Sequence, residues 1–210
     1  IAMAKKKNMK VMLYSNGIGP LERKGNIKKT KKILDKVDLI TLRDERSYKT
    51  LSEIGIENKN VKVTADPALD LDIADEKLGK AILKNEGVPS DKKLLGVSVR
   101  KWQNLGSDFE TQIANACDYA YEKYGYYTVF LPMQSSRDTA IMQNIKRKMK
   151  HESAIIKKRY SVEGMLSIIK CFDMCIGMRL HTLIYAAINS VPLIGLVYDP
   201  KINSFMEYTH

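Results

Sequence analysis

Short apolar runs alternate with longer amphipathic segments along the whole chain. The apolar runs predict strands at residues 11–15, 39–42, 61–64, 94–99, 127–131, 154–156, 174–177 and 192–198. The amphipathic segments predict helices at residues 26–36, 45–54, 75–85, 108–124, 139–149, 162–169 and 181–189, and another that begins near residue 201. Because the strands are continuous apolar runs rather than alternating ones, we expect parallel sheets covered on both faces, and therefore an α/β fold.

Turn-forming residues interrupt this alternation around Gly87, Pro89 and Ser90. They predict a boundary between two α/β units, residues 1–88 and 89–210, that face each other across a cleft. Only three short β/α steps precede this boundary, so we expect the N-terminal unit to be incomplete.

The composition is that of a globular protein with a strong positive charge. Hydrophobic residues make up 44% of the 210 residues, and the formal net charge is +11. The basic runs lie at residues 5–7, 28–32, 146–150 and 157–159. They fit either a solvated lysine-rich surface or attraction to anionic lipid or a phosphate-bearing substrate. Nucleic-acid binding is disfavoured, because aromatic residues do not interleave with these runs and no recognition motif occurs.

The cysteines and histidines indicate no metal centre. Cys117, Cys171 and Cys175 lack CxxC spacing and are expected to be packing thiols in a reduced, cytoplasmic setting. His181 has no cysteine or histidine ligand nearby, and the carboxylates show no ligand spacing. No apolar run reaches the roughly 20 residues of a membrane span.

Polar residues that can handle anions follow several of the predicted strands. Arg179 and His181 come after the strand at residues 174–177, and Asp199 and Lys201 come after the strand at residues 192–198. Arg100 and Arg43 likewise close two other strands. Open parallel sheets bind ligands at this edge, and a helix N-terminus there favours negative groups.

Six short motifs occur in an order that resembles the polysaccharide pyruvyl transferase family. They are GIGP at 17–20, RDERS at 43–47, ADP at 65–67, Arg100, P-x-Q with a later aspartate (Pro132, Gln134, Asp138), and GMRLH at 177–181 followed by YDPK at 198–201. Each motif alone is weak, but together they extend over nearly the whole chain.

This resemblance implies an enzyme that moves the enolpyruvyl part of phosphoenolpyruvate onto a bacterial cell-surface sugar as a ketal. It implies a cytoplasmic enzyme at the inner membrane face, a lipid-linked acceptor containing an N-acetylhexosamine, and no cofactor besides the donor substrate. The implied fold is glycosyltransferase-B-like, with the site between two Rossmann-like halves. The family normally opens with a glycine-rich loop and continues past YDPK, so we expect this chain to be a fragment.

Phosphoenolpyruvate needs fixed cations for two anionic groups and one proton donor. With the resemblance, Arg179 is expected to bind an anion, His181 to act as general acid or base, and Lys201 to neutralise the leaving phosphate. Arg100 and Arg43 are expected to make further anion contacts, Asp199 to orient Lys201 or bind a sugar hydroxyl, and Gln134 and Asp138 to contact sugar.

Structural interpretations of the same residues stay open. Arg43 can form a local ion pair with the following acidic residues, and Arg100 can be a solvated strand end. Asp199 can be only a helix N-cap and Lys201 a solvated lysine. The ADP tripeptide is expected to be a structural turn. Two other functions also stay open: a nucleotide-sugar-dependent glycosyltransferase of similar fold, and a non-catalytic fragment of such an enzyme.

Overall fold

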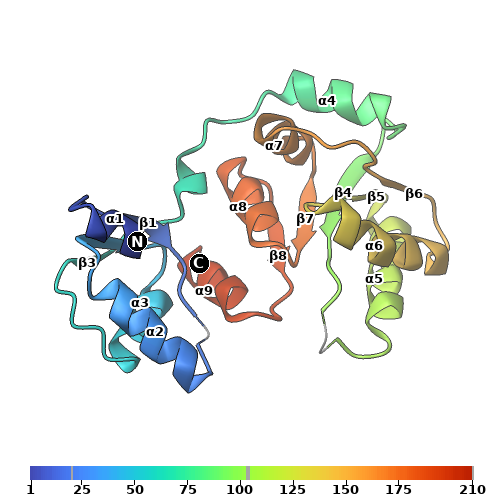
Figure 1. The fold of residues 1–210 in the computed structure, drawn as a ribbon. Helices are drawn as coiled ribbons and strands as arrows, with labels where there is room; N and C mark the ends of the chain where they lie inside the picture. Colours follow the sequence, from blue (N-terminus) through green and yellow to red (C-terminus); the bar gives the residue numbers. More distant parts are fainter. Residues whose placement is uncertain (20, 103–104, 210) are drawn as a thin grey trace. The chain divides into compact units, whose positions relative to one another are not determined.

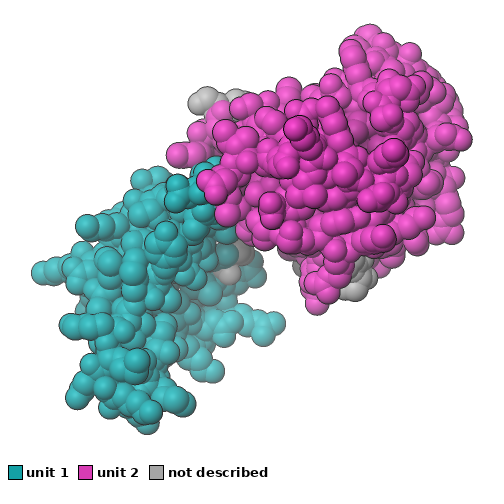
Figure 2. Space-filling view, turned by 90° about the horizontal axis from the view of Figure 1, so that it is seen from above, with its two compact units in different colours: residues 1–70, 210 teal, residues 71–209 magenta. Residues whose placement is uncertain are grey.

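The computed structural model describes residues 1–19, 21–102 and 105–209, except for the side chains of residues 135 and 136. The chain forms two compact units, residues 1–70 and 71–209, and each contains one parallel sheet (Figure 1). Figure 2 colours the two units separately. Parallel sheets combined with helices confirm the predicted α/β class.

Unit 1 (residues 1–70) is built on a sheet in the order β1-β2-β3. The strands are β1 (Met12–Asn16), β2 (Leu39–Leu42) and β3 (Val61–Val63); the helices are α1 (Ala2–Lys6), α2 (Lys24–Leu34) and α3 (Glu45–Glu53), with a 3-10 turn η1 (Pro67–Asp70). Ile40 and Leu42 of the central strand are fully buried and pack with Leu34, Val37 and Leu51. The helix α1 was not predicted.

Unit 2 (residues 71–209) is built on a sheet in the order β6-β5-β4-β7-β8. Its elements are α4 (Glu76–Asn85), β4 (Lys93–Ser98), α5 (Phe109–Tyr124), β5 (Tyr126–Phe130), α6 (Ser135–Lys148), β6 (Ser153–Ile155), α7 (Val162–Lys170), β7 (Met174–Gly177), α8 (Leu180–Ile188), β8 (Leu193–Gly195) and α9 (Pro200–Tyr208).

Helices cover both faces of this sheet. Val97 of the central strand packs in one core cluster with Ile113 of α5 and Met142 of α6. The neighbouring position Gly96 points the other way, since a Cβ there would meet the ring of Phe172, which follows α7. Two-sided burial explains why the strands of unit 2 are continuous apolar runs.

The strand order of unit 2 reverses between β4 and β7. The chain runs from β4 through β5 to β6 at one edge, and then returns to β7 and β8 on the other side of β4. Ser98 at the end of β4 lies opposite Gly177 at the end of β7. Such a reversal opens a crevice at the carboxyl ends of the strands, where ligands of α/β proteins bind.

The packing divides the chain between residues 70 and 71, earlier than the predicted boundary at 88/89. Helix α4 packs on α7 and therefore belongs to unit 2. The approach is so close that a Cβ on Gly79 would lie 2.0 Å from the carbonyl oxygen of Ser167. The turn signals at 87–90 mark the connection from α4 to β4 inside this unit.

Two predicted elements have different limits in the structure. The strand predicted at 192–198 is only Leu193–Gly195, because β8 is an edge strand that pairs with β7 alone. Helix α6 begins at Ser135 rather than at residue 139, because the Asp138 carboxylate accepts a hydrogen bond from the Gln134 backbone N–H and closes the first turn. Among the described residues, no helix combines the length and the apolar character that crossing a bilayer requires.

Replacing Gly79 by alanine is expected to lower the free energy of unfolding by about 1–3 kcal/mol, because the added methyl group forces α4 away from α7. Urea unfolding measures the change. Gly25→Ala is the matched control: nothing lies within 4 Å of the added Cβ, so stability should stay equal or rise by about 0.5 kcal/mol. A Gly79→Ala protein as stable as the wild type would contradict the close packing of α4 on α7.

Candidate functional site

Arg179 and Asp138 form an ion pair at the carboxyl edge of the sheet of unit 2. Arg179 is the N-cap residue of α8, and its Nε lies 3.1 Å from Asp138 Oδ2. Its Nη2 donates to Asp138 Oδ1 and, at 3.3 Å, to Oε1 of Gln134. The Asp138 side chain is 0% exposed and that of Arg179 is 16% exposed. The structure thus brings together three predicted site residues, although Gln134 and Arg179 lie 45 positions apart in the sequence.

The geometry of this pair explains its stability. A buried carboxylate needs a hydrogen-bonded cation, and the planar guanidinium supplies two donors in a fixed orientation. The Gln134 backbone N–H donates to Asp138 Oδ2 at 2.9 Å and adds a further hydrogen bond. Arg179 is consequently held in one orientation where the strand order reverses, next to a helix N-terminus that favours anions.

His181 is the exposed residue of this group. It lies in the first turn of α8, two positions after Arg179, and its ring centroid is 6.1 Å from that of Tyr185. An exposed imidazole at the carboxyl edge of the sheet can exchange protons with a ligand there. Of the other two histidines, His151 stacks on Tyr121 at 4.1 Å on α5, and His210 lies outside the described residues.

Asp199 and Lys201 lie together at the start of α9. Asp199 is the N-cap, and its Oδ1 accepts a hydrogen bond of 3.0 Å from the Lys201 backbone N–H. Its Oδ2 lies 3.8 Å from the Lys201 ammonium. The N-cap interpretation of Asp199 is therefore correct, and the same carboxylate also faces the lysine that it was expected to orient.

Arg100 is enclosed by two aromatic rings that sequence reasoning did not connect with it. Its guanidinium carbon lies 5.0 Å from the ring centroid of Trp102 and 5.9 Å from that of Tyr198. The rings contact each other edge to face with centroids 4.9 Å apart. In the described part of the chain, Arg100 Nε and the Tyr198 hydroxyl are buried without a hydrogen-bond partner. Arg100 is thus a half-buried cation that lies against two aromatic rings rather than a fully solvated strand end.

Three of the sequence motifs meet in unit 1. Arg43 Nη1 lies 3.2 Å from Asp66 Oδ2, and Arg43 Nε lies 3.5 Å from Asp44 Oδ2. Gly17 lies against this guanidinium, since a Cβ there would be 2.6 Å from Arg43 Nε. The motifs GIGP, RDERS and ADP therefore converge at the carboxyl edge of this sheet, with Pro20 of GIGP outside the described residues.

The local interpretation of the RDERS motif also holds. Asp44 is the N-cap of α3, and its Oδ1 accepts from both the backbone N–H and the hydroxyl of Ser47 at 2.7 Å. Asp66 was expected only to form a turn. It accepts a hydrogen bond of 3.1 Å from the Ala68 N–H, as a turn residue does, and it also forms an ion pair with Arg43.

A carboxylate anchors the basic loop 157–160 of unit 2. Glu86 accepts hydrogen bonds from the backbone N–H groups of Lys157 and Lys158, at 2.8 and 3.2 Å, and from the Tyr160 hydroxyl at 2.7 Å. Burial alone would raise the pKa of Glu86, but these hydrogen bonds hold it below its ordinary value. Burial and the Glu86 carboxylate raise the pKa of Tyr160 to about 12. The loop is thus fixed near the end of α4.

The two buried cysteines fit packing rather than chemistry. Burial raises the pKa of Cys117 to about 11 and that of Cys175 to about 12, so neither forms a thiolate near neutral pH. No cluster of three or more histidine, cysteine or acidic residues within the described ranges has the geometry of a metal site.

Solved structures with a similar fold place the chain in a structural class. MnaA of S. aureus, solved with UDP, aligns with a TM-score of 0.70 at 15% identity, over 98% of this chain and 56% of MnaA. The UDP-GlcNAc 2-epimerase of Methanocaldococcus jannaschii, solved with UDP-GlcNAc and UDP, gives 0.66 at 17% identity, over 98% and 58%. HepE of Anabaena, solved with UDP and glucose, gives 0.64 at 9% identity, over 92% and 55%.

These likenesses define the fold class: Rossmann-like α/β units of the glycosyltransferase-B-like type, as predicted. The chain spans somewhat more than half the length of each of these proteins. No curated protein sequence matches the chain. The family model for polysaccharide pyruvyl transferases, however, matches residues 1–200, and the chain belongs to this family of transferases.

Replacing Asp138 by alanine is expected to lower the free energy of unfolding of unit 2 by about 3–5 kcal/mol, because the partly buried Arg179 guanidinium loses its paired carboxylate. Chemical denaturation followed by circular dichroism measures this. Asp108→Ala is the control, because Asp108 is exposed and its loss should cost under about 1 kcal/mol. Similar losses for both variants would show that the ion pair is not a structural centre.

Replacing Glu86 by glutamine is expected to lower the melting temperature at pH 7 but not at acidic pH. Because the folded-state pKa of Glu86 is lowered, its contribution is complete above the unfolded value of about 4.3 and is lost as the pH falls through the folded value. Melting curves from pH 7 to pH 3 should therefore converge. Glu53 is exposed, so the Glu53→Gln control should melt at the wild-type temperature at every pH. If the melting temperature of Glu86→Gln differed from that of the wild type by the same amount at all pH values, an ionised Glu86 carboxylate would not be what anchors the loop.

Proposed function

We propose that this protein transfers the enolpyruvyl group of phosphoenolpyruvate to a sugar of a cell-surface polysaccharide precursor and forms a pyruvate ketal. Membership of the polysaccharide pyruvyl transferase family supports this, together with a set of cationic residues at the carboxyl edge of unit 2. The observation that carries the proposal is the fixed Arg179 guanidinium beside the exposed His181 on one helix start.

The reaction needs no oxidant or reductant. One proton adds to the methylene carbon of phosphoenolpyruvate, and one sugar hydroxyl adds to the enol carbon. A second hydroxyl then replaces phosphate on the same carbon. The two hydroxyl protons balance the proton gained by the methyl group and the proton carried by the released phosphate. Because atoms and electrons balance, we propose that the donor substrate is used without a cofactor.

His181 is proposed as the general acid or base, because its imidazole is exposed at the site and an imidazole can both give and take a proton. Arg179 and Arg100 are proposed to bind the carboxylate and phosphate of the donor. Arg179 is already oriented by Asp138, which lowers the cost of ordering it when the anion arrives. Arg100 has a buried Nε without a partner in the described structure, which suits an anion contact.

Lys201 is proposed to stabilise charge on the leaving phosphate, with Asp199 holding its position at the start of α9. Gln134 is proposed to contact a sugar hydroxyl near Arg179. Arg43, held by Asp66 in unit 1, is proposed as a further substrate contact. The basic runs fit a lipid-linked acceptor at the anionic cytoplasmic face of a membrane, where each lysine or arginine near the surface is worth about 1 kcal/mol.

A nucleotide-sugar-dependent glycosyltransferase is the second candidate, because structures of similar fold hold UDP or UDP-sugars. The two functions differ in the donor. Release of phosphate from phosphoenolpyruvate supports the first function, whereas release of UDP from a UDP-sugar supports the second.

In a phosphate-release assay with phosphoenolpyruvate and a lipid-linked N-acetylhexosamine saccharide, His181→Ala is expected to lower kcat by about 100-fold or more, because the proton-transfer group is lost. His151→Ala is the matched control, since this histidine lies against Tyr121 away from the helix start and should leave kcat within about twofold. Equal activity of the two variants would remove His181 from the mechanism. The proposed function would be overturned if the enzyme released no phosphate from phosphoenolpyruvate but released UDP from a UDP-sugar.

A further inference from the structure

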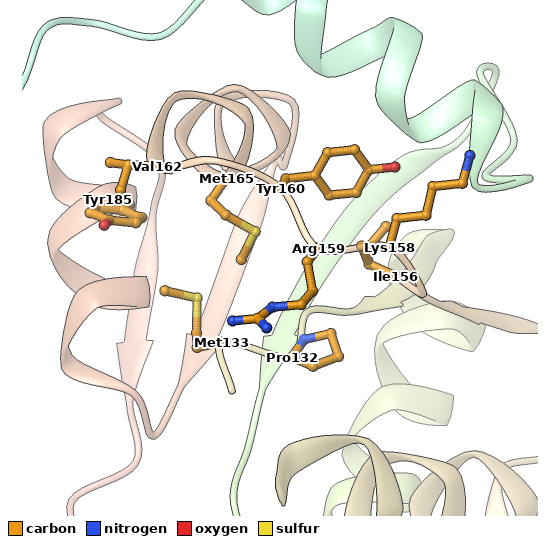
Figure 3. A pocket seen from close by; sticks show the side chains of 9 residues that line it. All are labelled: Pro132, Met133, Ile156, Lys158, Arg159, Tyr160, Val162, Met165 and Tyr185. Carbon is orange, nitrogen blue, oxygen red and sulfur yellow. The ribbon is translucent and has the colours of Figure 1, made fainter. Parts of the chain in front are cut away.

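A cavity in unit 2 has a lining that the proposed function does not use. It is a hollow of about 200 Å³ at the carboxyl ends of β5 and β6 and the start of α7 (Figure 3). The residues that line it include Met133, Lys158, Arg159, Tyr160, Met165 and Tyr185. We call it the Arg159 hollow. Its volume is below the roughly 300 Å³ at which sites for drug-sized molecules begin, so it suits one sugar-sized group.

Arg159 gives this hollow its charge. In Figure 3 the Arg159 side chain extends into the hollow between Met133 and Met165, whereas Lys158 and Tyr160 extend toward α4. The Tyr160 hydroxyl donates to Glu86 there. The backbone of the neighbouring Lys158 is held by the same carboxylate. The guanidinium is thus presented from an anchored loop, although the side chain itself is exposed.

Apolar side chains supply much of the rest of the lining. In Figure 3 the two methionines lie nearest the Arg159 guanidinium, whereas Val162 and the Tyr185 ring lie together on the far side. A ligand that fits this combination has an apolar ring face and an anionic group. The C–H face of a hexose packs on methionine and aromatic side chains, and a phosphate on the same sugar pairs with a guanidinium in two places.

The Arg159 hollow adjoins the site around Arg179 and His181 within the same unit. Met133 is the chain neighbour of Gln134, which accepts a hydrogen bond from Arg179. Tyr185 lines the hollow, and its ring centroid is 6.1 Å from that of His181. A ligand in the hollow would therefore contact Met133 and Tyr185, which are direct neighbours of Gln134 and His181, two residues assigned to the reaction.

We propose that the Arg159 hollow binds the phosphate-bearing sugar of the acceptor, with the phosphate on Arg159 and the sugar ring against Met133, Met165 and Tyr185. The identity of the acceptor rests on the proposed function, but the binding of a sugar phosphate does not. This assigns a specificity role to Arg159, which the sequence shows only as part of a basic run.

The test is a calorimetric titration that measures the affinity of the full chain for N-acetylglucosamine 1-phosphate. Arg159→Gln is expected to weaken binding about 10-fold or more, because a charge-assisted pair is lost. Arg147→Gln is the matched control: it removes the same charge from an exposed position on α6 outside the hollow and should change the affinity less than twofold. N-acetylglucosamine without phosphate should bind weakly to all three proteins.

Titrations with inorganic phosphate, phosphoenolpyruvate and UDP distinguish other occupants. Affinity for phosphoenolpyruvate should be the same in Arg159→Gln and wild type. The proposal is overturned if wild type does not bind the sugar phosphate, or if Arg159→Gln binds it as well as wild type. It is also overturned if inorganic phosphate binds the wild type as tightly as the sugar phosphate does, or if Arg159→Gln loses as much affinity for phosphoenolpyruvate as for the sugar phosphate. Tighter binding of UDP than of the sugar phosphate, with the same loss of affinity in Arg159→Gln, would overturn it as well. These binding measurements need no turnover. They can therefore be interpreted even if the phosphate-release assay shows no activity.

Discussion

The ion pair between Arg179 and the buried Asp138 joins the two halves of the unit 2 sheet. Asp138 follows β5 on one side of β4, and Arg179 follows β7 on the other. A carboxylate that is 0% exposed is stable in this place only with a hydrogen-bonded cation, so each partner fixes the other. The pair thereby sets where Gln134 and the first turn of α8 lie. The proposed chemistry of His181 depends on this arrangement, because the imidazole is carried by that turn.

The same arrangement of charges recurs in unit 1. Arg43 closes the central strand and is held by Asp66, which follows the neighbouring strand β3. Gly17, after β1, leaves room for the guanidinium. In each unit an aspartate that follows another strand orients an arginine at the carboxyl edge of the sheet. A guanidinium that is oriented before an anion arrives binds it at a lower entropic cost.

The alternation of apolar and amphipathic segments was enough to predict the class of fold and most of the elements, because strands buried on both faces are continuous apolar runs. The motif order was enough to predict the family. The boundary at 88/89 differs from the observed division, since a turn between two packed elements resembles a linker in sequence. Helix α4 belongs to unit 2 because it contacts α7, more than 80 residues later in the chain. The local sequence pattern around α4 gives no information about that contact.

Partners that are distant in sequence were also beyond prediction. Arg179 and Asp138 were both singled out, yet nothing in their own motifs pairs residues 41 positions apart. The cage of Trp102 and Tyr198 around Arg100 joins residues after β4 and after β8. Arg159 is one cation within a basic run, and only the direction of its side chain into the hollow distinguishes it from its neighbours (Figure 3).

Binding of phosphoenolpyruvate beside His181 is the central proposal. The sequence has only three histidines, so their ring C–H signals in an NMR spectrum can be assigned and followed one by one. When phosphoenolpyruvate is titrated into the full chain, we expect the His181 signal to shift to saturation while the His151 signal stays in place. A spectrum in which the His181 signal does not move at saturating phosphoenolpyruvate, or in which it moves only with UDP, would contradict the proposal.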